Sequence, residues 1–430
     1  MAKTYRPYVP EQDLLLPPSL REWLPEDHLA FFVSDLIDQL DLSAITTVYE
    51  DEERGYPPYH PVMLTKVVVY AYCVGVFSSR KIQRRLVEDV AFRVLAAGNA
   101  PDFRTIADFR KTHLPVLRGF FEQVLRLARE LGAPRVGRVA LDSTKIKANA
   151  SKHKAMSYGR MREKQRQLRE EVNDLLAQAE ATDAAEDAEY GADHRGDELP
   201  AELQRRESRL QRIRDAKRAL EARAKAEAVA SGKPAESAKP DPKAQYNFTD
   251  PESRIMKGPD GFVQAYNVQV AVDDLQLIVG HAVTQETNDK KQLMPMIRTI
   301  ERQSGDTPMQ LLADAGYCSD ESLRAIATTT IDAYISTRKQ KHGERPGPCP
   351  RGPMPTSATI VDRMSRKLLT KTGATVYAAR KGIVEPVIGQ IKQARGFRQF
   401  LLRGVEKVQG EWSLVCTTHN ILKLYRLCVC

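Results

Sequence analysis

The chain has 430 residues, which is enough for two or three domains and a sizeable hydrophobic core. Its formal net charge of +9 favours a polyanionic partner, although charge alone decides neither the partner nor the fold. None of the six cysteines lies in the C-x-x-C spacing of a zinc ligand pair, and no secretory signal precedes them, so we expect a reducing, cytoplasmic setting. The most apolar run, residues 67–77, is too short to span a bilayer, and we expect no membrane partner.

The first part of the chain predicts a set of helices. Apolar residues keep helical spacing from residue 25 to about 42, and a buried apolar helix is expected over 62–77. A basic helix, SSRKIQRRLVEDV, opens at Ser78 or Ser79. Further helical segments are expected from about 102, over 105–113 and over 118–131, the last one ended by Gly132.

The basic helix has two interpretations. Short helices joined by tight turns, one of them rich in Arg and Lys, indicate a helix-turn-helix-like module that binds DNA. A solvated basic helix on a helical bundle explains Arg80, Lys81, Arg84 and Arg85 about as well.

The pattern changes after residue 132. Residues 136–141 are a strand candidate that runs into Asp142. Residues 160–230 are rich in charged residues, with a sparse heptad pattern of apolar residues. This composition predicts two long helices that form an exposed antiparallel hairpin, for which we expect no catalytic role.

Strands return beyond the hairpin. Residues 262–272 alternate in hydrophobicity and are expected to pair with 277–284 through a turn at Asp273 and Asp274. Asn288 or Asp289 is expected to cap the helix that follows, over 291–303. The remaining predicted elements are a strand over 309–313 that ends at Asp314, a helix over 320–327, a strand over 331–336, a Pro- and Gly-rich connector over 343–355, and a last helix that carries Glu385.

Three carboxylates stand out in this order of elements. Without the hairpin, the chain from residue 136 is predicted as strand, strand, strand, helix, strand, helix, strand, helix. Asp142 ends the first strand, Asp314 ends the fourth, and Glu385 lies on the last helix, so the three are expected to converge at one edge of the sheet. Such a group suits two Mg²⁺ ions about 4 Å apart. The alternative is that each Asp is a turn residue and that Glu385 only begins a helix before Pro386.

Four stretches of the chain resemble the DDE transposases of bacterial insertion sequences. They are LDSTKIKANAS around Asp142, TDPESRIMKG at 249–258, LLADAGYCSD around Asp314, and VEPVIGQIKQARGFRQFLLRG around Glu385. The resemblance implies a ribonuclease-H-like catalytic domain in which these three acids are both the catalytic residues and the ligands of two Mg²⁺ ions, with Mn²⁺ as a substitute. It implies a DNA transposase that binds the ends of an insertion sequence and catalyses metal-dependent cleavage and strand transfer.

A related branch of the family carries a Tyr-x2-Arg-x3-Glu-x6-Lys signature. The chain has Tyr377, Arg380, Glu385 and Lys392, with one additional residue between the arginine and the glutamate. Many similar sequences also carry a cysteine cluster before the last helix, but only Cys349 is present there, so no zinc is assigned.

The fold class that follows is α+β and multidomain. We expect an all-helical domain for DNA binding or assembly over residues 1–132, and a ribonuclease-H-like catalytic domain with a mixed sheet over 133–430. The helical hairpin is expected as an insertion at 158–245 within the second domain.

The expected partner is double-stranded DNA, at the transposon ends and at the target, bound by a homodimer in the bacterial cytoplasm at the nucleoid. Lys392 is expected next to the scissile phosphate because it is seven residues from Glu385 and would share a helix face with it. Two alternatives remain: a nuclease on the same fold that cuts without joining, and a non-catalytic DNA-binding protein derived from a transposase. The expected DNA contacts are Tyr377, Arg380, Lys392, Arg395, Arg398, Arg403, Lys145, Lys147, Arg80 and Arg84.

Overall fold

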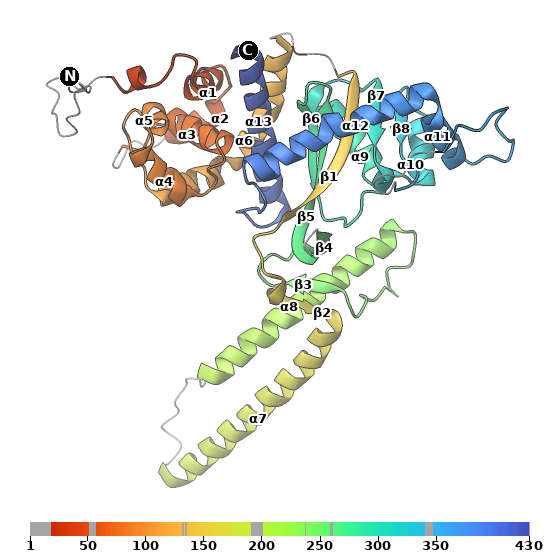
Figure 1. The fold of residues 1–430 in the computed structure, drawn as a ribbon. Coiled ribbons are helices and arrows are strands. Elements are labelled where there is room, and N and C mark those ends of the chain that lie inside the picture. Colours follow the sequence, from red (N-terminus) through yellow and green to blue (C-terminus); the bar gives the residue numbers. More distant parts are fainter. Residues whose placement is uncertain are drawn as a thin grey trace, which may run out of the picture.

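The structure is a computed structural model that describes residues 19–50, 57–130, 133, 136–190, 201–236, 238–258, 261–339 and 347–429. A mixed sheet occupies the centre, helices cover both of its faces, and a long helical hairpin projects away from it (Figure 1). The predicted helix end at Gly132 and the first part of the predicted connector at 343–355 lie outside the described residues.

The central sheet has six strands in the order β4-β5-β1-β7-β8, with β6 also paired to β5. The pairs β1–β5, β4–β5 and β5–β6 are antiparallel, whereas β1–β7 and β7–β8 are parallel. The predicted order of three strands followed by alternating helices and strands is therefore present. The short strands β2 (Ala155–Ser157), β3 (Gln245–Asn247) and β4 (Arg254–Gly258) were not predicted. The sheet strands are β1 (Arg138–Lys147), β4 (Arg254–Gly258), β5 (Gly261–Asp273), β6 (Ile278–Thr284), β7 (Gln310–Ala313) and β8 (Asp332–Ile335).

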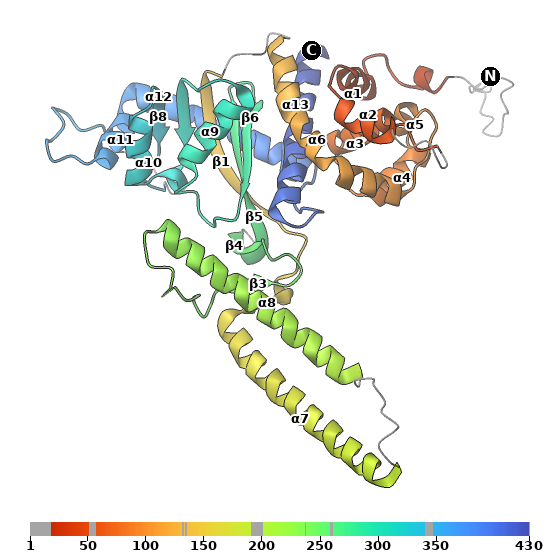
Figure 2. The same cartoon turned by 180° about the vertical axis from the view of Figure 1, so that it is seen from behind.

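Alternate residues of the central strands pack into two different hydrophobic clusters. On β1, Ala140 and Ile146 join the larger cluster, whereas Val139 and Leu141 join the smaller one. Helix α12 crosses the face that carries the larger cluster (Figure 1). Helix α9 lies over the opposite face, which carries the smaller cluster, in the view from behind (Figure 2). The helices of this half are α9 (Leu293–Ser304), α10 (Asp320–Ala327), α11 (Ile360–Leu369), α12 (Lys371–Gly389) and α13 (Val405–Val429).

The first part of the chain is helical, as predicted, but one boundary was wrong. Helix α6 runs without a break through Pro115, where separate helices over 105–113 and 118–131 were expected. Its buried face continues across the proline, with Leu114 and Leu117 on either side of it, so packing outweighs the lost backbone hydrogen bond. The helical elements here are a 3₁₀ turn (Leu20–Trp23), α1 (Leu29–Asp38), α2 (Ser43–Glu50), α3 (Pro61–Cys73), α4 (Ser79–Glu88), α5 (Val90–Leu95) and α6 (Phe103–Glu130).

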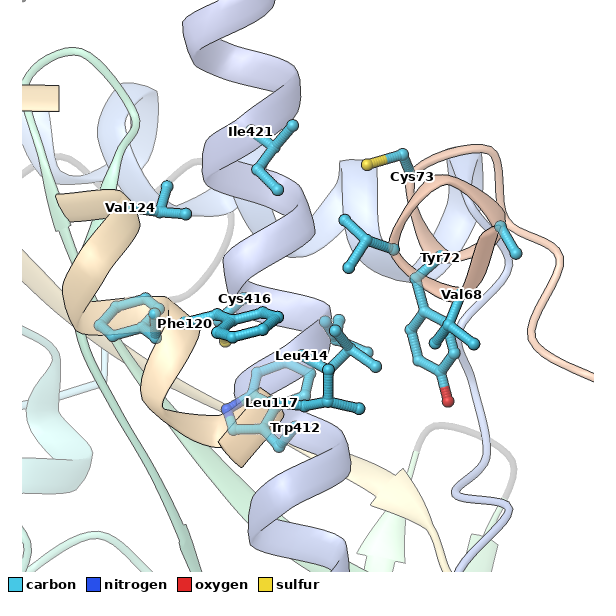
Figure 3. Close-up of a cluster of buried hydrophobic side chains, with 14 of the residues drawn as sticks. Val68, Tyr72, Cys73, Leu117, Phe120, Val124, Trp412, Leu414, Cys416 and Ile421 are labelled. Atoms are coloured by element: carbon cyan, nitrogen blue, oxygen red, sulfur yellow. The ribbon is translucent and has the colours of Figure 1, made fainter. Parts of the chain in front are cut away.

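The C-terminal helix α13 packs between the N-terminal helices and the sheet. Figure 3 shows Phe120 of α6 and Tyr72 of α3 on either side of α13, which contributes Trp412 and Cys416. All four side chains are fully buried in one cluster that also contains residues of β1 and β5. The hydrophobic core therefore continues across the expected division between residues 132 and 133, and that division stays a proposal.

The helical hairpin consists of α7 (Tyr158–Tyr190) and α8 (Ala201–Ala230), which pack against each other as predicted. Its apolar contact is thin and includes Met161 and Leu168 of α7 and Ile213 of α8. Two short strands, β2 (Ala155–Ser157) and β3 (Gln245–Asn247), pair antiparallel at the base and hold the two ends of the hairpin together.

Candidate active site

Asp142 lies inside strand β1 and does not end it, which corrects the predicted position. The strand continues to Lys147 because its pairing with β5 continues, whereas the parallel pairing with β7 stops at Leu141 and Ala313. Asp142 is therefore the first β1 residue beyond the end of β7. The pleat places it on the same face as Ala140, toward helix α12.

Asp314 directly follows β7, as predicted. Its Oδ1 accepts a hydrogen bond from the backbone N–H of Gly316 at 2.9 Å, which caps a single 3₁₀ turn (Ala315–Tyr317). Burial raises the pKa of Asp142, the charge of Asp314 acts in the same direction, and the charge of Arg380 opposes it. The two strand carboxylates are thus close enough to influence each other.

Arg380 joins Asp142 to the third predicted acid. Its Nη1 is 3.0 Å from Asp142 Oδ2 and its Nη2 is 3.6 Å from Glu385 Oε1. The Arg380 side chain is only 10% exposed, whereas the Glu385 side chain is 53% exposed. Glu385 lies near the C-terminal end of α12, which begins at Lys371, so the alternative that this glutamate begins a helix is wrong.

The three acids do not form a closed metal site in this conformation. Among the described residues, no group of three or more His, Cys, Asp or Glu side chains is arranged to hold a metal ion. Arg380 binds an oxygen of Asp142 and faces one of Glu385. The donor set still suits Mg²⁺, because it consists of carboxylate oxygens within β1, directly after β7 and on a helix that crosses the sheet.

Asp289 was expected to cap a helix, and the structure corrects this. Helix α9 begins after Gln292, which makes no side-chain capping bond. The Asp289 carboxylate instead accepts three side-chain hydrogen bonds: from Ser143 Oγ at 2.8 Å, from Asn267 Nδ2 at 2.8 Å and from Gln269 Nε2 at 2.6 Å. The sequence contained a signal for this, since a buried strand that reads NVQVAV must satisfy its Asn and Gln side chains somewhere.

On β1, Lys145 and Lys147 lie on the opposite face of the sheet from Asp142 and Thr144. Lys145 is half-buried, and burial lowers its pKa while the charges of Asp289, Asp314 and Asp142 act to raise it. Lys147 is exposed. Lys145 therefore lies within the field of the carboxylates, and Lys147 lies on the surface beside them.

Lys392 and Tyr377 lie on the same side of β1 as Asp142. The Lys392 ammonium donates to Thr144 Oγ1 at 2.9 Å, from a π-helical segment (Gln390–Ala394) that follows α12. This wider turn changes the helical phase, so the seven-residue spacing from Glu385 does not establish a shared face. Tyr377 is half-buried, and burial raises its pKa.

The arginines after Lys392 have different environments. Arg395 donates to Thr418 Oγ1 at 2.8 Å and to the Val415 carbonyl at 3.1 Å, and burial lowers its pKa to about 10. The Arg395 guanidinium is thus bound to α13 in this structure, which argues against the expected contact with DNA. Arg398 and Arg403 are exposed and remain candidates for DNA contacts.

A buried polar chain connects this basic segment to the N-terminal helices. Glu411 is fully buried and accepts from the backbone N–H groups of Leu401 and Leu402 at 3.0 and 3.1 Å. It also accepts from the Tyr72 hydroxyl at 3.3 Å, and that hydroxyl accepts from Arg110 at 3.1 Å. The position of the segment that carries Arg398 and Arg403 thus depends on α3 and α6.

Arg80 and Arg84 lie on α4, on the side of the molecule away from β7 and β8 (Figure 1). Both are exposed. Arg84 pairs with Glu88 at 2.8 Å, and the Arg80 guanidinium lies 4.8 Å from the centre of the Phe103 ring. The structure does not bring these two arginines together with the carboxylates.

Two family models match the chain in the parts described above. Residues 18–112 match a transposase domain (DUF772), and residues 354–425 match a transposase DDE domain that includes Arg380, Glu385 and Lys392. These two matches support a DDE transposase. The Tyr-Arg-Glu-Lys branch and a bacterial insertion-sequence origin stay predictions.

No curated protein and no solved structure matched the chain. Within the described residues, none of its helices combines the length and apolar character that crossing a bilayer requires.

Proposed function

We propose that the chain is a transposase that binds the ends of an insertion sequence, cleaves the DNA there and joins it to a target, with Asp142, Asp314 and Glu385 as its catalytic acids. One observation carries the proposal. Asp142 lies beyond the end of the neighbouring strand β7, Asp314 directly follows that strand, and Arg380 connects Asp142 to Glu385 on the helix that crosses the sheet.

The chemistry requires divalent metal, for which these three acids are the proposed ligands. Two bound Mg²⁺ ions, or Mn²⁺ in their place, would supply activation of the attacking oxygen and stabilisation of the leaving oxygen. For all three acids to serve as ligands, Arg380 must release Asp142. A released Arg380 guanidinium, with the nearby Lys392 ammonium, is then free to hold a DNA phosphate.

We extend the proposal to the fold and the assembly. The sheet, with three antiparallel strands and two strands parallel to the first, supports a ribonuclease-H-like catalytic domain. The proposed partners are transposon-end and target DNA bound by a homodimer, and the proposed location is the bacterial cytoplasm at the nucleoid. Tyr377, Lys145, Lys147, Arg398, Arg403, Arg80 and Arg84 are the other proposed DNA contacts.

A strand-transfer assay tests the function. Labelled linear DNA that carries the sequences flanking the reading frame is incubated with the full chain, a supercoiled target plasmid and either Mg²⁺ or EDTA. Transfer of the label to the plasmid with Mg²⁺ and not with EDTA is the expected result. Cleavage without transfer would favour a nuclease, and binding without cleavage would favour a non-catalytic DNA-binding protein.

A further inference from the structure

Asp289 is bound so completely that its orientation is fixed by the protein. Its Oδ1 accepts from Asn267 Nδ2 and Gln269 Nε2, and its Oδ2 accepts from the Ser143 hydroxyl. Both amide donors belong to residues of β5 that are fully buried. A half-buried carboxylate held by three donors is costly to move, because each donor would lose its partner.

One of these bonds leads directly to Asp142. Ser143 donates its hydroxyl to Asp289 and its backbone N–H to Asp142 Oδ1, the latter at 2.7 Å. The strand pleat turns the Ser143 side chain away from α12 and toward Asp289. Asp289 therefore fixes the residue whose backbone orients the Asp142 carboxylate.

A second route leads to Asp314. Gln269 donates to Asp289 through Nε2 and accepts the hydroxyl of Tyr317 through Oε1, and Tyr317 ends the turn that Asp314 caps. Gly316 of that turn lies between the two acids: a Cβ there would be 2.9 Å from Asp314 Oδ1 and 3.3 Å from Asp289 Oδ2. The two carboxylates thus approach each other across a backbone that has no room for a side chain.

We propose that Asp289 is a fourth carboxylate of this site and acts as a positioning residue. It holds Asp142 and the turn after Asp314 in fixed positions relative to each other. The inference rests on the proposed function, because it concerns the metal-binding acids. Three protein donors, Ser143, Asn267 and Gln269, already bind Asp289, so we assign it the role of orienting ligands and not of binding metal. Partners of this kind typically change metal affinity about 10- to 100-fold when they are replaced.

Manganese binding to the full chain, measured by the loss of the free Mn²⁺ electron paramagnetic resonance signal, tests this without DNA or activity. Asp289→Asn keeps the size and most hydrogen bonds of the side chain but removes its charge. Glu286→Gln makes the same charge change three residues away at an exposed position. We expect Asp289→Asn to bind the same number of ions about tenfold more weakly than the wild type, and Glu286→Gln to bind like the wild type.

Ser143→Ala provides a second variant in case Asp289→Asn does not fold. It removes only the hydroxyl that links Asp289 to the Asp142 strand, and we expect it to weaken Mn²⁺ binding several-fold at unchanged stoichiometry. Wild-type affinity in both variants would overturn the inference, as would the loss of one bound ion in Asp289→Asn, which would make Asp289 a ligand. If the wild type itself binds no Mn²⁺, the result would instead contradict the proposed function.

Discussion

The Arg380 guanidinium is hydrogen-bonded to Asp142 at 3.0 Å, and this contact connects α12 to the central strand of the sheet. Arg380 also faces Glu385 at 3.6 Å, so one cation lies between two acids that would otherwise repel each other. The chain has one residue more between Arg380 and Glu385 than the family signature has. The contact with Asp142 gives Arg380 a role that does not depend on that spacing.

Replacing Arg380 should destabilise the metal-free protein. In Arg380→Gln the partly buried Asp142 loses its charged partner, and we expect the free energy of unfolding to fall by about 2 kcal/mol. Urea denaturation in EDTA measures this. Lys381→Gln, which removes an exposed charge one residue away, should change it by less than about 0.5 kcal/mol.

Added Mn²⁺ should stabilise Arg380→Gln more than it stabilises the wild type. In the variant the metal replaces a missing positive charge, whereas in the wild type it must first displace the guanidinium. Equal stabilisation of the two proteins would contradict the idea that Arg380 and metal compete for Asp142.

We expect Arg398 to bind DNA and Arg395 to have a structural role, and replacing them should therefore give different phenotypes. Arg398→Gln should weaken binding to all DNA sequences alike and reduce the slope of log affinity against log salt by about 0.9, because it removes one phosphate contact. Arg395→Gln should leave that slope unchanged and lower the melting temperature, because its guanidinium binds Thr418 and Val415 of α13. Fluorescence anisotropy over a salt series measures the slopes, and a reversal of the two phenotypes would refute the assignment.

The helical hairpin should be removable without loss of the sheet. Replacing residues 162–228 with a short Gly/Ser linker leaves the β2–β3 pair, which closes the base of the hairpin. We expect a soluble protein with a cooperative unfolding transition and Mn²⁺ binding like that of the full chain. An aggregated or molten product would show instead that the hairpin is part of the folding core.

Much of the fold follows from local patterns in the sequence. The predicted helix over 320–327 matches α10, and the predicted hairpin of strands at 262–272 and 277–284 matches β5 and β6 within about one residue. These elements have clear periodicity and turn residues at their ends, so tertiary contacts did not change them. The apolar residues Val384, Val387, Ile388 and Ile391 keep helical spacing in the sequence; in the structure Ile388 is partly buried and the other three are buried.

The errors lie where long-range partners decide the structure. Asp142 was placed at a strand end because the sequence does not show that β5 extends the pairing of β1 to Lys147. Asp289 looked like a helix cap because Asp favours that position, but buried Asn267 and Gln269 on another strand bind it more completely. The π-helical turn at Gln390–Ala394 likewise has no periodic signal and changed the expected face of Lys392.

The central claim is that Asp142, Asp314 and Glu385 catalyse metal-dependent cleavage, and Asp314→Asn tests it most directly. Asp314 makes no ion pair among the described residues, so the neutral variant should fold and bind the flanking DNA like the wild type. Its exposed neighbour Asp320, six residues further along in the first turn of α10, provides the matched control Asp320→Asn. With labelled flanking DNA and Mg²⁺, we predict that Asp314→Asn loses cleavage by at least about a thousandfold while Asp320→Asn cleaves like the wild type. Wild-type cleavage by Asp314→Asn would contradict the account.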